Sequence, residues 1–160
     1  MTLRAHGAWC QHGTMKALLP LLALMVLSAP APAQTAADSA AVIRAALDYI
    51  EGFYDGDSTK LIRAVHPEVN KYGFGYHAGL QQWTGYGMSF AGFLESAREV
   101  REGVERVPPG APKAVELLDV MDQTAAAKVT AIWGVDYLLL AKFDGRWMIR
   151  QVLWQSSRRR

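Results

Sequence analysis

Residues 125–156 read AAAKVTAIWGVDYLLLAKFDGRWMIRQVLWQS, and this run carries the strongest structural pattern in the chain. Apolar and polar residues alternate along much of it, and Val, Ile, Leu, Tyr and Trp are frequent, which is typical of β-strands. Asp144-Gly145 is a strong signal for a two-residue hairpin turn, and Asp122-Gln123-Thr124 marks a turn before it. We therefore expect a four-strand antiparallel meander over residues 113–122, 126–135, 136–143 and 146–155.

Two helices are expected at the start of the folded domain. Apolar residues recur at steps of three and four, with Ile43 first, and predict an amphipathic helix from about Ser39 to Gly56. Asp57 can cap a second helix, which we expect to end at Pro67 because a proline ring disfavours the helical conformation of the residue before it. These helices precede every expected strand.

Residues 68–87 have a different character, because glycines alternate there with aromatic residues. We expect a short strand near 69–75, followed by a mobile aromatic loop. A third helix begins near Ser89, and the proline-rich segment 108–112 breaks the chain after it. The expected order is helix, helix, short strand, helix and meander, which is a single α+β domain without internal repeats.

The first 33 residues have the pattern of a secretory signal peptide. Lys16 supplies a positive charge, residues 18–27 form an apolar run too short to span a bilayer, and Ala31-Pro32-Ala33 offers small residues for cleavage. We expect residues 1–33 to be removed and the protein to be exported, either to the periplasm or to the medium. Met15 is a better candidate than Met1 for the first residue of this signal peptide. The alternatives are an uncleaved anchor or a buried helix.

Cleavage would leave a domain over residues 34–156 and a basic tail at 157–160. Of the 17 Lys and Arg residues, Arg4 and Lys16 leave with the signal, so that 15 remain against 15 Asp and Glu residues. The folded body therefore lacks the basic face that nucleic-acid binding requires. The only cysteine, Cys10, also leaves, which excludes a disulfide scaffold, a cysteine zinc site, a thiol nucleophile and a lipoprotein anchor.

Three motifs carry a resemblance to a known family. They are ALDYIEGFYDGD at residues 46–57, HPEVNKYGF at 66–74 and the whole run at 125–156. Together they resemble the putative lumazine-binding family within the NTF2-like (SnoaL-like) superfamily, and the resemblance spans about residues 40–156. It implies an NTF2-like cone, in which a curved antiparallel sheet wraps around helices. Relatives with this fold include isomerases, polyketide cyclases, dehydratases and non-catalytic binding modules, so function must be argued from the site.

The resemblance implies that the first helices, the aromatic loop and the concave sheet face line the interior of the cone. Aromatic walls with a few polar groups suit a small, flat, apolar or aromatic ligand. The other interpretation is that these aromatics pack as core, which would make the protein a purely structural dimer. The candidate ligand-binding residues are Tyr49, Phe53, His66, Trp83, Tyr86, Trp133, Tyr137 and Trp154.

A second possible function is a cofactor-free isomerase or dehydratase. His66 would shuttle protons, Asp136 would orient it, and Tyr49, or alternatively Tyr137, would lie nearby as the third catalytic residue. A ketosteroid-isomerase mechanism also needs a carboxylate base after the second helix, and the sequence has no acidic residue between Glu68 and Glu95. The competing interpretation of His66 is a helix C-terminus, where an imidazole is already favourable.

The sequence gives no support for a cofactor or a metal. Phosphate-binding and nucleophile-elbow motifs are absent, and His66 and His77 lack the spacing of metal ligands. In a regular strand Trp133 and Asp136 would face opposite sides, unless the chain bulges near Gly134.

The last two strands predict a partner surface. We expect their alternating apolar residues to share the outer face of the sheet, where a monomer rarely leaves so much apolar surface exposed. The resemblance implies a homodimer formed through that face. We expect no stable membrane anchor, because the apolar run at residues 18–27 is too short to span a bilayer. The alternative is that the helices cover this face. The residues concerned are Leu138, Leu140, Ile149, Gln151, Leu153 and, at the edge, Ile132.

Overall fold

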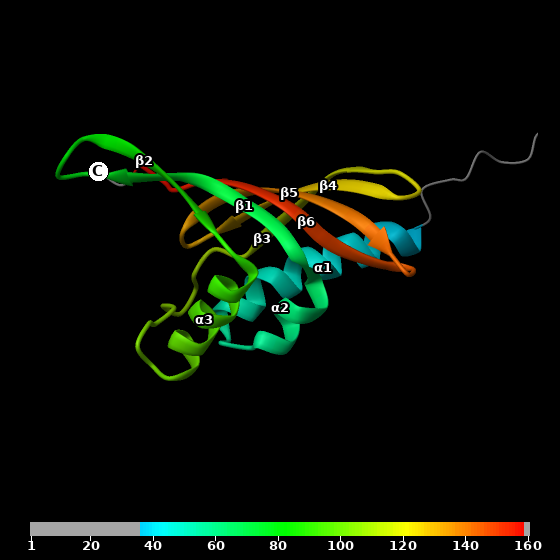
Figure 1. The fold of residues 1–160 in the computed structure, drawn as a ribbon, viewed down its shortest axis with the longest axis horizontal. Helices are drawn as coiled ribbons and strands as arrows, with labels where there is room; N and C mark the ends of the chain where they lie inside the picture. The colour runs from blue at the N-terminus through cyan, green and yellow to red at the C-terminus, as the bar shows by residue number, and fades with distance from the viewer. Residues whose placement is uncertain (1–35, 159–160) are drawn as a thin grey trace, which may run out of the picture. The chain divides into compact units, whose positions relative to one another are not determined.

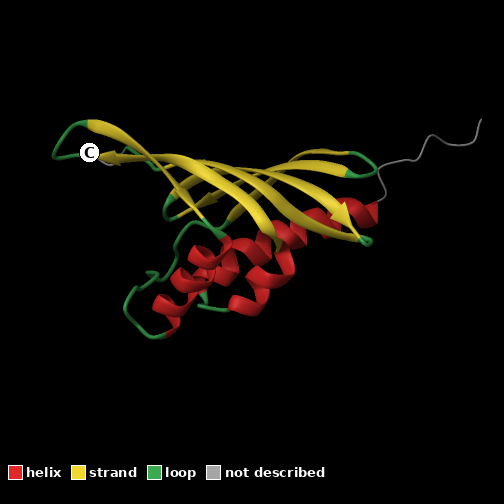
Figure 2. Ribbon diagram, in the orientation of Figure 1, coloured by secondary structure: helices red, strands yellow, loops and turns green. Residues whose placement is uncertain are grey.

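Three helices lie against one face of a curved six-stranded sheet in the computed structural model, which describes residues 36–158 (Figure 1). Figure 2 shows that none of the described helices lies on the opposite face of the sheet. The expectations about residues 1–33 lie outside the described residues. Within the described range no helix is long and apolar enough to cross a membrane.

The elements follow the predicted order with one additional strand. The sheet order is β2-β1-β6-β5-β4-β3, and every neighbouring pair is antiparallel except β1 and β6, which run parallel. The bounds are α1 Ala36–Tyr54, α2 Ser58–Ala64, β1 Val65–His77, β2 Gln82–Met88, α3 Phe90–Arg101, β3 Ala114–Val120, β4 Thr124–Ala131, β5 Gly134–Phe143 and β6 Arg146–Gln155. The expected meander is therefore β3 to β6.

The first helix is confirmed, but its buried stripe is displaced from the expected one. Ile50 of the expected stripe is buried together with Val42, Tyr49 and Phe53, whereas Ile43 is 36% exposed. The stripe also includes the small residues Ala45 and Ala46, which bring α1 close to the sheet. A pattern read from large apolar residues alone misses these alanines, and for that reason the predicted face is shifted by about one residue.

The predicted end of the second helix is wrong. Asp57 does cap α2, because its side chain accepts a hydrogen bond from Thr59 N, but the helix ends at Ala64. Val65 already belongs to β1 and pairs with Ile149. Pro67 fits within this strand because the β1–β6 register shifts between Val65 and Asn70, where the ladder is interrupted.

The expected aromatic loop is instead a long hairpin. β1 runs for 13 residues and pairs with β2 from Lys71↔Met88 to His77↔Gln82, which gives six strands rather than five. Packing explains two of these glycines, since a Cβ on Gly73 would overlap the Trp154 side chain and one on Gly85 would overlap the Tyr72 side chain. In β1 the alternation separates two faces, with Gly73 over Trp154 and the exposed Tyr72 and Phe74 on the other side.

The expected outer face of the sheet is wrong for half of its residues. Leu138, Leu140 and Ile149 are buried under the helices, whereas Gln151 and Leu153 are exposed. The cause is a β-bulge in β6, because Leu140 pairs with Ile149 while Leu139 pairs with Gln151. One extra residue reverses the alternation along the strand. The alternative interpretation, that the helices cover this face, holds for the three buried residues.

Candidate functional site

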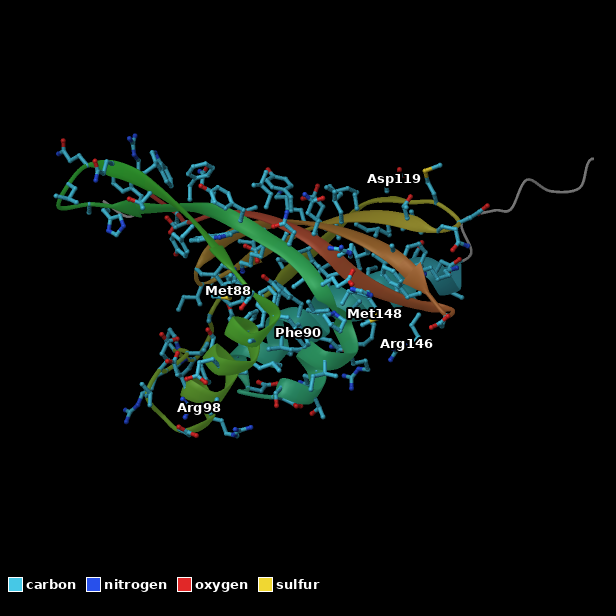
Figure 3. All side chains as sticks on the ribbon, in the orientation of Figure 1. Met88, Phe90, Arg98, Asp119, Arg146 and Met148 are labelled. Atoms are coloured by element: carbon cyan, nitrogen blue, oxygen red, sulfur yellow. The ribbon has the colours of Figure 1, made fainter. Side chains whose placement is uncertain are left out.

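A cavity of about 390 Å³ lies between the helices and the concave face of the sheet. Most of its walls are aromatic or aliphatic. Met88, which lies where β2 leads into α3 (Figure 3), forms part of one wall. The lining residues are Phe53 and Tyr54 from α1, Lys71 from β1, Tyr86 and Met88 from β2, Ser96 and Val100 from α3, Glu105, Arg106 and Val107 after it, Ile132 and Trp133 between β4 and β5, and Trp154 from β6.

A tight turn brings Trp133 into this cavity. β4 ends at Ala131 and β5 begins at Gly134, and these two residues pair, so Ile132 and Trp133 form a two-residue loop. Trp133 therefore lies outside the regular alternation, and its indole Nε1 donates to both carboxylate oxygens of Asp136 at 3.1 Å. The predicted boundary between strands 126–135 and 136–143 is therefore wrong, because the chain turns at Ile132-Trp133, and this turn rather than a bulge near Gly134 removes Trp133 from the alternation.

Tyr54 fixes this turn to α1. Its hydroxyl accepts a hydrogen bond from Ile132 N at 2.7 Å and donates one to Pro112 O at 2.6 Å. The same ring packs edge-on against Trp133, with 5.6 Å between the ring centroids. One side chain thus holds the proline-rich segment and the indole wall in place.

The floor of the cavity is a buried polar network around Lys71. Its ammonium Nζ donates to the Tyr49 hydroxyl at 2.7 Å, and that hydroxyl donates to Asp136 Oδ2 at 2.6 Å. Lys71 Nζ lies 3.6 Å from the same carboxylate oxygen. Asp136 is fully buried and Lys71 is 7% exposed. A buried charge is tolerated when it is paired and hydrogen-bonded, and this network meets both conditions.

Aromatic rings surround the Lys71 ammonium. Nζ lies between 5.3 and 5.8 Å from the ring centroids of Tyr49, Phe53, Phe93, Trp133 and Trp154. Ring faces attract a cation at such distances. Burial lowers the pKa of Lys71, and the neighbouring Asp136 carboxylate opposes that shift. Burial, with the nearby Asp136 charge and hydrogen bond, raises the pKa of Tyr49 well above its usual value, so its hydroxyl stays protonated.

The structure brings together five of the eight residues expected to bind a ligand. Phe53, Tyr86, Trp133 and Trp154 line the cavity, whereas Tyr49 is fully buried and joins the site through its hydrogen bond with Lys71. The remaining three lie elsewhere.

His66, Trp83 and Tyr137 do not line this cavity. His66 stacks on Phe143 with 4.3 Å between the centroids, and its Nδ1 accepts from the backbone N–H of Glu68. Trp83 packs beside a tyrosine near the tip of the hairpin, and Tyr137 is exposed on the outer sheet face. His66 is a strand residue rather than a helix cap, because α2 ends two residues before it.

The isomerase or dehydratase alternative is not favoured by this arrangement. It requires His66 and Asp136 to converge on one cavity. Only Tyr49 and Asp136 meet, in the Lys71 network, while the His66 ring contacts Phe143. Neither Tyr49 nor Asp136 therefore lies beside His66 to exchange a proton with it.

Lys71 is the residue of the buried polar network that the sequence analysis missed. Charged residues in strands are usually solvated, so nothing in composition marked it. The strand alternation did carry a signal, since Lys71 shares its parity with Gly73 and Gly75, whereas Tyr72 and Phe74 point outward. Because the aromatic residues of this strand point outward, the alternation predicts that Lys71 faces inward.

Comparisons with known proteins match this architecture. The family model described as putative lumazine-binding matches residues 37–155. None of the curated proteins matches significantly. Among solved structures, the chain is similar to an NTF2-like protein of unknown function from Shewanella baltica, at 21% identity and TM-score 0.55, over 77% of this chain and 96% of that one.

Two further solved structures show the same likeness. An NTF2-like protein of unknown function from Silicibacter pomeroyi is 19% identical, with TM-score 0.57 and coverage of 76% of this chain and 97% of its own. A third, from Methylobacillus flagellatus and also of unknown function, is 17% identical with TM-score 0.57, over 77% and 94%. At these identities the neighbours establish the fold alone.

Proposed function

Because this chain belongs to the putative lumazine-binding family, we propose that it binds a small, flat, aromatic molecule in the cavity above Lys71. The observation that carries the proposal is a cavity of about 390 Å³ with aromatic walls and a single buried ammonium at its floor. Ligand sites typically enclose a few hundred Å³ and combine apolar walls with a few placed polar groups.

The two parts of the site recognise different parts of such a ligand. Phe53, Trp133 and Trp154 offer ring faces and edges for the apolar body. The Lys71 ammonium supplies a hydrogen-bond donor for an oxygen atom of the ligand, and its charge is already balanced by Asp136. Lumazine, a bicyclic ring system with carbonyl oxygens, has both features, and the family description makes it the first probe.

Filling the cavity tests this proposal. Ser96 lines the cavity from α3, so the Ser96→Trp variant is expected to place an indole in the ligand's space and to weaken lumazine binding at least tenfold. Ala91 lies on the same helix but is exposed, and Ala91→Trp is expected to bind as wild type does. Titration calorimetry measures both affinities. Equal binding by wild type and Ser96→Trp would place the ligand outside this cavity.

We also propose that the mature protein begins at Gln34, is exported, and forms a homodimer through its outer sheet face. Tyr72, Leu153 and Tyr137 form one cross-strand row there, since Leu153 pairs with both tyrosines, and all three are exposed. Phe74 and Leu139 extend the patch. A second copy related by two-fold symmetry would bury the same patch on both chains.

Native mass spectrometry of the protein recovered from the secreting host tests export and association together. The expected species is a dimer of chains covering residues 34–160. Leu153→Lys is expected to give monomers, because it places a charge within the buried row, whereas Ile62→Lys on exposed α2 is expected to remain dimeric. A wild-type monomer would contradict the sheet interface, and a chain that retains residues 1–33 would contradict the processing.

A further inference from the structure

We propose that Lys71 forms a reversible Schiff base with an aromatic aldehyde held in the cavity. This inference rests on the ligand-binding function proposed above and names its substrate class. It follows from the placement of a primary amine at the floor of a ligand-sized cavity, next to a hydroxyl and a carboxylate that can exchange protons with it.

Lys71 differs in position from the other lysines of the described residues 36–158. Lys60, Lys113, Lys128 and Lys142 each lie within 3.1 Å of a carboxylate oxygen and are more exposed than Lys71. Lys71 alone among them lines the cavity. A lysine desolvated in an apolar pocket is the usual form of the Schiff-base nucleophile.

The fraction of neutral amine depends on the groups that face Lys71. Burial lowers its pKa, which raises that fraction at neutral pH, while Asp136 on β5 opposes the shift. Tyr49 on α1 faces it as a protonated hydroxyl. The other ionisable cavity groups are Tyr54 on α1, Tyr86 on β2, and Glu105 and Arg106 after α3.

The reaction balances without an oxidant or a reductant. The Lys71 ammonium first gives up a proton, and the neutral amine attacks the carbonyl carbon. A C–N bond forms as the C=O π bond breaks, and the nitrogen loses a second proton while the carbonyl oxygen takes one up, which gives a carbinolamine. The hydroxyl group then leaves as water after accepting a second proton, and a C=N bond forms. The Tyr49 hydroxyl, which is hydrogen-bonded to both Lys71 and Asp136, is placed to carry these protons.

The site is also suited to the product. The sum of the steps converts an ammonium and an aldehyde into a protonated iminium and water, so the positive charge at this position is conserved. The Asp136 carboxylate and the five surrounding rings therefore stabilise the iminium as they stabilise the ammonium. An aromatic aldehyde adds ring contacts with the walls, which a small aliphatic aldehyde lacks.

Reductive trapping tests the inference. Wild-type protein is incubated with 2-naphthaldehyde and sodium cyanoborohydride at neutral pH, and intact mass and peptide mapping follow. The expected result is one naphthylmethyl group on Lys71, added at least tenfold faster than on any other lysine. Lys128→Arg is expected to be labelled as wild type, since Lys128 lies away from the cavity beside Glu116. Lys71→Arg is expected to lose the rapid label, because a guanidinium does not form the imine.

A matched alcohol separates the two proposals. Excess 2-naphthalenemethanol is expected to bind the cavity and to protect Lys71 from labelling, which tests the site in wild-type protein even if Lys71→Arg does not fold. Binding of the alcohol without labelling of Lys71 by the aldehyde would overturn the Schiff base and leave the binding function standing. Absence of binding by both compounds would overturn both. Equal labelling of all lysines would also overturn the Schiff base.

Discussion

The free energy of unfolding of the Asp136→Asn variant is expected to be about 3–5 kcal/mol lower than that of the wild type, because the substitution removes one partner of a buried ion pair. Lys71 would keep a buried charge without its counter-ion, and the Trp133 indole would lose a charged acceptor. Urea denaturation at neutral pH, followed by circular dichroism, measures the difference. Asp136 is fully buried, so water cannot solvate the Lys71 ammonium in place of the lost carboxylate.

Asp119→Asn is the matched control. Asp119 is exposed on β3, as Figure 3 shows at the edge of the sheet, and its replacement is expected to change stability by less than about 0.5 kcal/mol. The double variant Asp136→Asn/Lys71→Met is expected to recover part of the loss, since it removes the stranded charge as well. A loss below about 1 kcal/mol in Asp136→Asn would contradict the ion pair.

The stability of Asp136→Asn is also expected to rise with pH. Burial lowers the folded-state pKa of Lys71, and the Asp136→Asn variant lacks the carboxylate that opposes that shift. The unfolded state then binds more protons than the folded state at every pH between the lowered value and the ordinary lysine pKa of about 10.4, so the free energy of unfolding increases across that window. The wild type is expected to show a shallower slope.

The Gly134→Ala variant is expected to lose about 2–5 kcal/mol of stability, from two costs at one position. Gly134 has a φ of 136°, which side chains rarely adopt, and an added Cβ would overlap the backbone oxygen of Gln155. The strand cannot move away without shifting Trp133, which precedes Gly134 in the turn. We therefore expect lumazine affinity to fall together with the thermal midpoint.

Gly145→Ala separates these two costs. Gly145 also has a positive φ, of 78°, but a Cβ there would meet no atom within 4 Å. The Gly145→Ala variant is expected to lose only about 1 kcal/mol of stability, because only the backbone conformation is unfavourable, and to bind lumazine as the wild type does. Equal losses in the two alanine variants would show that the close approach of β5 to Gln155 does not constrain the turn.

Local patterns predicted much of the fold correctly. The Asp144-Gly145 hairpin, the cap at Asp57 and the strands of the meander each depend on a few neighbouring residues. Their physical causes are turn geometry, side-chain capping and alternation, all of which are visible within a short window of sequence. The last strands also gave the family resemblance that the family model supports.

The wrong strand predictions depend on a distant partner. Residues 82–88 form a strand because β1 pairs with them, and β1 starts at Val65 because β6 lies beside it. Arg150 reverses the faces of β6 because the register with β5 shifts there. A short stretch of sequence carries no information about these strand pairings, so periodicity alone placed Leu138, Leu140 and Ile149 on the wrong face.

The sequence by itself determined the fold class, most of the strands and the set of aromatic residues from which the cavity walls are built. These features depend on β-propensity and hydrophobic periodicity, which act locally. Only the tertiary structure decided which aromatics meet, and it excluded His66, Trp83 and Tyr137 from the cavity. It also placed Lys71 of β1 beside Tyr49 of α1 and Asp136 of β5, residues far apart in the chain. Burial creates this site, because the chemistry of a lysine, a tyrosine and an aspartate changes only when folding removes them together from water.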